Sequence, residues 1–458
     1  MLDDMFDHLE QIRQRPVWQP APPPARAAFA KPLPRNATDL AEVHERFMQH
    51  ILPYVVGNAH PGFMGWVHGG GTPAGMLAEM LAGGLNANTG GRNQIALDVE
   101  EQITGWVREL FGFPACASGV FVTGTSMANL ISLIVARAST LGGSVRRTGV
   151  ATSGVRLTAY ASSATHSCIA RAIDIAGIGV DALRVIAVNS RQEIDIEALE
   201  RAVDADRRTG FTPFFIVGNA GTVDTGAIDD LAGLAAFAKS AGIWFHVDGA
   251  FGALAILSPA LAPRLKGIES ADSLGFDFHK WAQVPYDAGF VMIRDGALHR
   301  STFAVEPEYL RRADRGMAAH SPWPCDFGPD LSRGFRALKT WFTLTVYGAD
   351  ALAAVIESSC ALAQAAQQRI EATPELELLA PASLGIVCFR YRCVPANEIN
   401  AEILMRVQES GAVAPSSTTL NGCFAIRAAF FNHRSAVQDV EALLAQVVAA
   451  GRLLTRAA

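Results

Sequence analysis

A chain of 458 residues, 50% of them hydrophobic and 18% charged, is long enough for a large buried core and predicts two or three domains. The formal net charge of −6, without a dense run of Lys and Arg, argues against the basic face that binds nucleic acids. The seven cysteines are scattered without a Cys-x-x-Cys pair, which argues against a disulfide framework and favours reduced, buried thiols.

The N-terminus does not have the features of a secretion signal. Acidic side chains stand where a signal peptide carries an apolar run. No apolar run approaches the roughly 18–20 residues of a membrane span. We therefore expect a soluble cytoplasmic protein with no membrane contact.

A proline-rich segment follows a short predicted helix. Residues 3–15 have amphipathic helical periodicity, and segment 15–35 contains too many prolines to be helical through its centre. Trp18 and Phe29 would be unusual in a free linker, so this segment predicts either a linker or an arm that wraps a partner subunit. Helical periodicity resumes at 38–55.

Short apolar runs alternate with helix-like segments between residues 73 and 346. The runs have the length and the β-branched or aromatic content of strands. They are 119–124, 156–162, 184–189, 213–220, 242–248, 271–278 and 288–294. This alternation predicts an α/β architecture with a mostly parallel sheet. We therefore divide the chain into an N-terminal helical and proline-rich arm (1–72), a large domain (73–346) and a small C-terminal α+β domain (347–458).

A glycine-containing turn joins the first of these strands to a predicted helix. The first turn of a helix has unpaired N–H groups and the positive end of its dipole, so Gly124, Thr125 and Ser126 could bind a phosphate. The turn lacks the lysine of a Walker A loop, and the same residues would also serve as an ordinary N-cap.

Further polar side chains lie at or just beyond strand ends, where open α/β sheets bind ligands. Asp248 ends a strongly apolar strand and needs a partner there, because carboxylates are almost never buried alone. The small residue Ala250 would let a flat ring approach. Lys280 follows the next strand, and a desolvated amine is a nucleophile toward carbonyl groups. His166 and Thr222 are also compatible with a structural histidine and with turn chemistry.

Together these groups predict one ligand with three features. It carries a phosphate, a ring that pairs with an anion and an aldehyde that reacts with a lysine. Pyridoxal 5'-phosphate (PLP) has all three. We therefore predict PLP as the cofactor and no metal site.

Seven blocks of sequence support this prediction by their order and spacing. They are HPGFMGWV (60–67), TGTSMANL (123–130), SSATHSCIARA (162–172), GNAGTVDTGAIDDL (218–231), HVDGAFG (246–252), ADSLGFDFHKW (271–281) and RALKTW (336–341). From about residue 38 to 447 the chain resembles the group II PLP-dependent decarboxylases, and it is most similar to their aromatic-L-amino-acid branch. The resemblance implies fold type I, the aspartate-aminotransferase-like fold. It also implies a seven-stranded, mostly parallel sheet in the large domain and a homodimer with the active site at the interface.

The resemblance also implies the main catalytic roles. Lys280 forms the aldimine with the cofactor, Asp248 binds the pyridinium nitrogen and His166 stacks on the ring. The implied reaction is decarboxylation of an L-amino acid, with an aromatic amino acid favoured, to the amine and carbon dioxide.

Five further residues are implied to hold the cofactor. Thr125 and Ser126 bind the phosphate, with His279 beside it. Ala250 packs against the face of the ring opposite His166, and Thr222 lies along the ring edge.

One departure from the family concerns the final protonation. In the aromatic branch a tyrosine on a mobile loop is thought to supply the proton, but the matching segment 312–334 contains no tyrosine. The matching position falls near Trp323 or Pro324, and Tyr309 lies upstream of the segment. His320 could donate the proton instead.

A second departure concerns the substrate side. His68 and a run of glycines stand where the aromatic branch has larger, mostly apolar residues. We expect His68 to be structural or to meet the substrate, with Trp66 as a further substrate candidate. Family members without the loop tyrosine can instead consume oxygen and form aldehydes. An aldehyde synthase, a decarboxylase of glutamate or diaminobutyrate, a non-catalytic protein with this fold and an aminotransferase or desulfurase are therefore alternatives.

Overall fold

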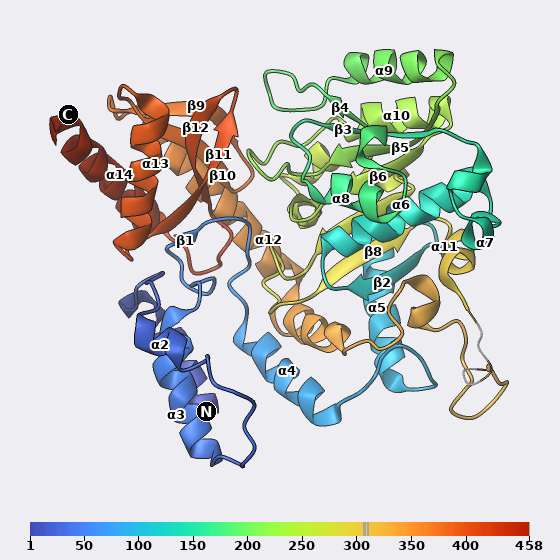
Figure 1. The fold of residues 1–458 in the computed structure, drawn as a ribbon, viewed down its shortest axis with the longest axis horizontal. Helices are drawn as coiled ribbons and strands as arrows, with labels where there is room; N and C mark the ends of the chain where they lie inside the picture. The colour runs from blue at the N-terminus through green and yellow to red at the C-terminus, as the bar shows by residue number, and fades with distance from the viewer. Residues whose placement is uncertain (306–307, 309–310, 458) are drawn as a thin grey trace. The chain divides into compact units, whose positions relative to one another are not determined.

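The computed structural model describes residues 1–305, 308 and 311–457, which form two compact units (Figure 1). The large unit comprises Gly71–Ser358. The small unit combines Met1–Gly70 with the C-terminal residues from Ser359 onward. The predicted N-terminal arm therefore lies in the same unit as most of the predicted C-terminal domain.

A seven-stranded sheet forms the centre of the large unit. In spatial order its strands are β2 (Ser118–Val122), β8 (Gly289–Ile293), β7 (Ser273–Asp277), β6 (Trp244–Asp248), β5 (Thr212–Asn219), β3 (Leu157–Ser162) and β4 (Leu183–Ile186). The five strands from β7 to β4 are parallel, whereas β8 is antiparallel to both of its neighbours. This sheet confirms the predicted α/β class with a mostly parallel, seven-stranded sheet.

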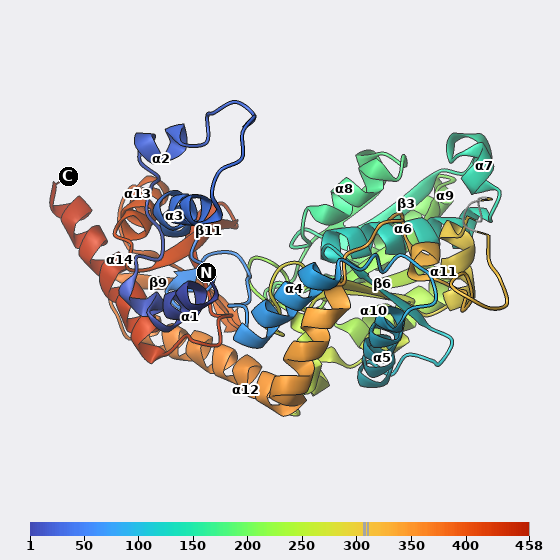
Figure 2. The same cartoon turned by 90° about the horizontal axis from the view of Figure 1, so that it is seen from below.

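Helices cover both faces of this sheet, which is why its strands are continuous apolar runs. They are α4 (Pro73–Leu85), α5 (Ile95–Leu110), α6 (Thr125–Leu141), α7 (Val145–Thr148), α8 (Cys168–Ile175), α9 (Ile196–Arg208), α10 (Leu231–Ala241), α11 (Gly296–Phe303) and the first part of α12 (Arg336–Glu371). Figure 2 shows α6 and α8 on one face and α5 and α10 on the other. Side-chain caps begin several helices, as where Asp230 accepts a hydrogen bond from the Gly233 N–H at 2.9 Å.

The small unit has a five-stranded sheet of its own. Its spatial order is β1 (Phe63–Met64), β11 (Ala414–Leu420), β12 (Cys423–Ala429), β10 (Ile386–Tyr391) and β9 (Leu376–Ser383). Its helices are α1 (Leu2–Glu10), α2 (Pro23–Ala27), α3 (Leu40–His50), α13 (Ala396–Glu409), α14 (Val437–Ala457) and the second part of α12. The N-terminal segment is tied to this unit, because the Val17 N–H donates to the Gly411 carbonyl at 2.8 Å and Arg13 pairs with Asp439 at 2.9 Å.

Helix α12 is interrupted rather than continuous. Its backbone leaves the helical region at Gly348, where φ is 78°. By length and composition this helix could cross a membrane, whereas the sequence analysis expected no such segment. After the interruption its buried residues recur every three or four positions, as in a helix that packs against a core: Leu352, Ile356, Ser359, Ala363, Ala366 and Ile370.

Candidate active site

The carboxyl ends of adjacent strands bring the predicted site residues of the large unit to one edge of the sheet. Asn219 at the end of β5 pairs in register with Asp248 at the end of β6, and Asp248 pairs with Gly275 on β7. Asp277 ends β7, three residues before Lys280. The parallel sheet thus gathers side chains that are 30 to 60 positions apart in the chain, as the ligand rule for such sheets predicts.

The carboxylate of Asp248 is the buried anion of this edge. Its Oδ2 accepts a hydrogen bond from the Asn129 amide at 2.9 Å, and its Oδ1 accepts one from the Ala250 N–H at 3.1 Å. Burial raises the pKa of Asp248, while the Asn129 hydrogen bond and the charges of Lys280 and His166 act in the opposite direction. The electrostatic influence of Lys280 and His166 shows that both lie near this carboxylate.

A line of buried polar groups stands behind Asp248. Asn129 also accepts from His246 Nε2 at 2.8 Å, and His246 Nδ1 lies 2.8 Å from the Ser273 hydroxyl, which accepts from the Trp244 indole N–H at 2.8 Å. Burial lowers the pKa of His246 to about 3, so this imidazole is neutral at neutral pH. The neutral network orients the Asn129 amide toward Asp248 without adding a competing charge.

The N-terminus of α6 has the properties of a phosphate site. The Thr125 hydroxyl is buried and makes no hydrogen bond within the described chain. A buried orphan donor of this kind needs a ligand. A Cβ on Gly289 would lie 2.4 Å from Gly124, so only glycine lets β8 begin so close to this turn.

His279 presents a donor to the same place. Its Nδ1 accepts a hydrogen bond from the Ala288 N–H at 3.0 Å. In the neutral ring the proton is therefore on Nε2, where it can be donated to a phosphate oxygen. Burial lowers the pKa of His279, which keeps the ring in this neutral form.

The remaining predicted cofactor contacts surround this edge in different environments. His166 and Ser126 are exposed, so the imidazole is free to lie on a ring. Ala250 is half-buried directly after Asp248 and Gly249. Thr222 is buried, and its hydroxyl accepts from the Ala227 N–H at 3.1 Å within the turn that follows β5. Its hydroxyl thus stabilises that turn, and its role at the ring edge stays a prediction.

Trp66 and His68 lie in the small unit. Together with Phe63 they form a cluster of rings whose centroids are 5.6–6.1 Å apart. The Trp66 side chain is 59% exposed, whereas His68 is half-buried with its Nδ1 at 3.4 Å from the Asn58 amide. Both stay candidate substrate residues.

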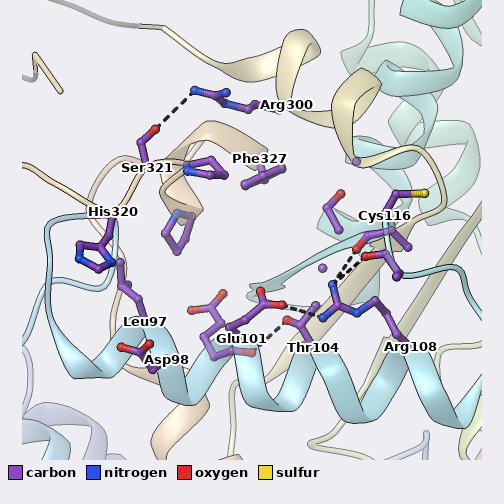
Figure 3. A pocket seen from close by; sticks show the side chains of 18 of the residues that line it. Leu97, Asp98, Glu101, Thr104, Arg108, Cys116, Arg300, His320, Ser321 and Phe327 are labelled. Carbon is purple, nitrogen blue, oxygen red and sulfur yellow. Dashed lines mark hydrogen bonds and ion pairs between the residues drawn. The ribbon is translucent and has the colours of Figure 1, made fainter. Parts of the chain in front are cut away.

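His320 lines a different cavity of the large unit. This cavity has a volume of about 540 Å³ and contains none of the predicted cofactor residues. Figure 3 shows His320 with Asp98, Glu101 and Arg108 among its lining side chains. Within the described residues of one chain, His320 is therefore not grouped with Lys280. The other tyrosine considered for this role, Tyr309, is outside the described residues.

Trp323 is held by its own chain. It is 1% exposed, its indole N–H donates to the Ala319 carbonyl at 3.0 Å, and the guanidinium groups of Arg312 and Arg92 lie 3.5 and 5.0 Å from its ring. A Cβ on Gly91 would meet the ring at 2.4 Å. These contacts favour a structural role for Trp323 over a substrate contact.

The sequence analysis did not identify two residues that touch the site. Asn129 binds the Asp248 carboxylate, and Asp277 contacts Lys280 at 2.8 Å and the Thr125 N–H at 2.7 Å. Asn129 lies four positions after Thr125 on α6, so helical periodicity could have placed the two on one face. Asp277 was visible only as a charged residue at the end of an apolar strand.

The residues present fit PLP at each of its three functional groups. The α6 N-terminus with the orphan Thr125 hydroxyl and His279 suits the phosphate. The buried Asp248 suits a protonated ring nitrogen, which would supply the partner that a buried carboxylate needs. Lys280 supplies the amine for the aldehyde.

Comparisons with known proteins agree with this fit. Residues 22–392 match the pyridoxal-dependent decarboxylase conserved domain. The chain is 31% identical to an aromatic-L-amino-acid decarboxylase of Bacillus atrophaeus, over 98% of this chain and 93% of that protein. It is also 31% identical to a phenylacetaldehyde synthase of Arabidopsis thaliana, over 94% and 90% of the two chains.

Solved structures show the same fold. The structure of Oryza sativa TDC with PLP and tryptamine matches 99% of this chain and 96% of its own, with a TM-score of 0.91 and 23% identity. The glutamate decarboxylase domain of a Vibrio parahaemolyticus protein named for diaminobutyrate–pyruvate transaminase and L-2,4-diaminobutyrate decarboxylase covers 98% and 93%, with a TM-score of 0.87 and 25% identity. The chain belongs to the pyridoxal-dependent decarboxylase family, and PLP is its cofactor.

Proposed function

We propose that this chain removes the carboxyl group of an aromatic L-amino acid and releases the amine and carbon dioxide. The observation that carries the proposal is the cluster at the sheet edge, where Lys280 and His166 lie near the buried carboxylate of Asp248. The cofactor supplies a ring that accepts the electron pair of the broken bond between Cα and the carboxylate.

The side chains of the cluster divide the work. Asp248 holds a proton at the ring nitrogen, because a buried carboxylate favours the charged form of an adjacent base. Lys280 binds the cofactor covalently and yields this place to the substrate amine. His166 covers the exposed face of the ring. One proton delivered to Cα, in place of the departed carbon dioxide, completes the amine.

The ring cluster of the small unit supports an aromatic substrate. Phe63 and Trp66 contribute to the lining of a hollow of about 350 Å³. The exposed indole of Trp66 offers a flat apolar surface of the kind on which aromatic side chains stack. Relatives named for aromatic amino acids, including tryptophan and tyrosine decarboxylases that are 29–30% identical, add to this support.

A second candidate function is an aldehyde synthase. Segment 312–334 contains no tyrosine, and Trp323, near the position expected for it, is buried against its own chain. In this reaction one molecule of oxygen is reduced to hydrogen peroxide, while the amine carbon is oxidised and then hydrolysed to aldehyde and ammonia. The 31% identity to a phenylacetaldehyde synthase makes this candidate specific.

One assay separates these candidates. The enzyme loaded with PLP is incubated with each standard L-amino acid, with DOPA and with 2,4-diaminobutyrate, and amine, carbon dioxide, aldehyde, ammonia and peroxide are quantified. Amine equal to carbon dioxide from an aromatic substrate is the expected result. Aldehyde equal to peroxide would select the synthase, and turnover of only glutamate or diaminobutyrate would contradict the aromatic substrate. Lys280→Ala is the inactive control.

We propose that the chain forms a homodimer. Large apolar side chains are exposed on α4, α5 and the first part of α12: Met80, Leu81, Leu85, Ile95, Trp106, Val346 and Tyr347. Trp106 and Leu344 also line an apolar hollow of about 570 Å³. Such a concentration of apolar surface is typical of a subunit interface.

Sedimentation velocity tests the dimer. The wild type is expected to sediment as a dimer, and Trp106→Glu to shift it toward the monomer, because a buried charge opposes association. Ile175→Glu, which changes an exposed isoleucine on α8, is the matched control and should remain dimeric. A wild-type monomer with full activity would contradict both the dimer and an active site at its interface.

A further inference from the structure

We propose that Asp277 is a positioning residue that ties the ε-amino group of Lys280 to the helix that receives the cofactor phosphate. Its Oδ2 lies 2.8 Å from Lys280 Nζ, and its Oδ1 accepts a hydrogen bond from the Thr125 N–H at 2.7 Å. One carboxylate therefore contacts both the covalent anchor and the first N–H group of α6. The proposal rests on the assignment of PLP and is independent of which amino acid is the substrate.

The bridge is held rigidly by its surroundings. The Asp277 side chain is only 3% exposed. Its backbone N–H donates to the Ala250 carbonyl at 3.0 Å, and the next N–H, that of Phe278, donates to the Ala288 carbonyl at 2.8 Å. A shift of Lys280 along the cofactor would therefore break either the contact with Asp277 or a backbone hydrogen bond.

The bridge also places a negative charge against the nitrogen of Lys280. The other titratable groups around this lysine are His279 on the same segment, Cys168 on α8 and Asp248 on β6. Burial lowers the pKa of His279 and raises that of Cys168 to about 12, so neither carries charge at neutral pH.

Asp248 is committed to the ring nitrogen, which leaves Asp277 as the anion next to Lys280. An anion at hydrogen-bond distance favours the protonated form of a nitrogen. We therefore infer that Asp277 keeps the nitrogen that joins Lys280 to the cofactor protonated. In that form the linkage is most reactive toward the incoming substrate amine.

A spectroscopic titration without substrate tests this role. The visible absorbance of the PLP-loaded enzyme depends on whether the nitrogen between lysine and cofactor carries a proton. In Asp277→Asn, which keeps the hydrogen-bond acceptor for Thr125 but removes the charge, the midpoint of the absorbance change is expected about 1–3 pH units lower than in the wild type. If the wild type shows no change up to about pH 10, the transition is expected to enter the measurable range only in the variant.

Two further variants make the result specific. Asp277→Glu keeps the charge and is expected to move the midpoint back toward the wild-type value. Asp287→Asn removes a carboxylate of the same segment that pairs with Arg336 at 2.8 Å, and it should leave the midpoint within about 0.3 unit.

Three results would overturn the proposal. They are a midpoint of Asp277→Asn within about 0.3 unit of the wild type, a rise in that midpoint, or equal shifts in the Asp277→Asn and Asp287→Asn variants. Because no substrate is present, failure of the proposed substrate or product cannot produce any of these results.

Discussion

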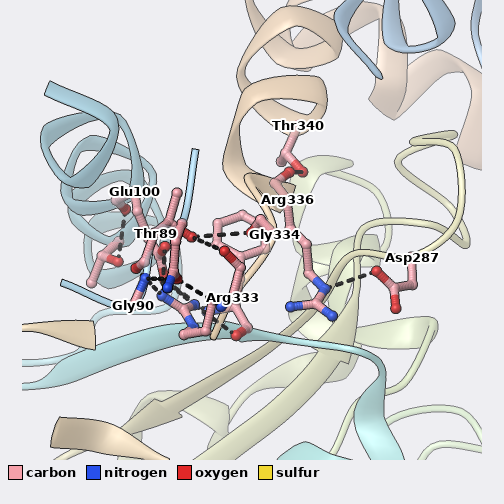
Figure 4. Close-up of polar contacts among 11 residues, drawn as sticks. Thr89, Gly90, Glu100, Asp287, Arg333, Gly334, Arg336 and Thr340 are labelled. Atoms are coloured by element: carbon pink, nitrogen blue, oxygen red, sulfur yellow. Dashed lines mark hydrogen bonds and ion pairs between the residues drawn. The ribbon is translucent and has the colours of Figure 1, made fainter. Parts of the chain in front are cut away.

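Arg333 and Glu100 form a bidentate ion pair that is almost completely buried. Arg333 Nη2 lies 2.6 Å from Glu100 Oε1, and Nη1 lies 3.1 Å from Oε2. The same guanidinium donates to the carbonyls of Thr89 and Phe121 at 3.0 and 2.8 Å, as Figure 4 shows for the labelled Thr89 and Glu100. The pair thereby fixes the end of segment 312–334 to α5 and β2.

Loss of this pair should destabilise the fold. In Glu100→Gln the buried guanidinium loses its charged partner, and the free energy of unfolding is expected to fall by about 3–5 kcal/mol. The adjacent Glu101→Gln is the matched control. Glu101 is 65% exposed and pairs with Arg108, so its loss should cost less than about 1 kcal/mol. Urea unfolding of both variants measures the difference, and equal losses would show that burial of the Arg333 pair has no effect.

Removal of Asn129 should reduce activity through Asp248. Asn129→Ala removes a hydrogen bond to a buried carboxylate, a contact of about 1.5–3 kcal/mol, so kcat/KM is expected to fall about 10- to 150-fold. Ser132→Ala, on the next turn of the same helix, deletes a buried hydroxyl without a hydrogen-bond partner in the described chain and should leave kcat/KM unchanged. Similar losses in both variants would point to a general disturbance of α6.

Neutralisation of Asp248 should affect the rate more strongly. In Asp248→Asn the ring nitrogen loses its anionic partner, and kcat is expected to fall by about two to four orders of magnitude. Asp272→Asn at the opposite edge of the sheet removes a carboxylate that accepts from the Phe245 N–H at 2.8 Å and should retain most of the activity. Retained PLP absorbance in Asp248→Asn would show that the loss lies in the rate. Wild-type kcat would contradict the assigned role.

Buried histidines should make stability depend on pH. Burial lowers the pKa of His299 to about 3 from 6.5, so between these values the unfolded chain binds a proton that the folded chain does not. Stability therefore rises with pH in this window and is lost on acidification. In His299→Gln the slope of unfolding free energy against pH should decrease by up to about 1.4 kcal/mol per unit. Urea unfolding between about pH 5 and pH 6.5 tests this, and an unchanged slope would contradict it.

Local sequence patterns were sufficient for much of the fold and for the grouping of the cofactor residues. The alternation of apolar runs predicted the parallel sheet, and strand ends place Asp248, Lys280 and the α6 N-terminus at one edge whatever the loops do. The contact of Asp277 with Thr125 was not predictable in this way. It joins positions 152 apart, and no local rule says which side chain faces the turn.

The same limit applies to the N-terminal segment and to Trp323. Proline content showed that 15–35 is not a helix through its centre, but the hydrogen bond from Val17 to Gly411 depends on a strand and helix some 400 positions later. Trp323 was a plausible substrate contact because exposure cannot be read from one aromatic residue. Its burial depends on Arg92 and Gly91, which lie more than 200 positions earlier.

The position of Trp323 between two guanidinium groups limits how the product of this enzyme could be redesigned. A tyrosine introduced at this position would inherit a closed site, with Arg312 on its ring and Gly91 against its edge. A phenol held there is sequestered from any reacting carbon. A change of product would therefore require at least two steps: release of segment 312–334 from the protein body, and then introduction of the phenol.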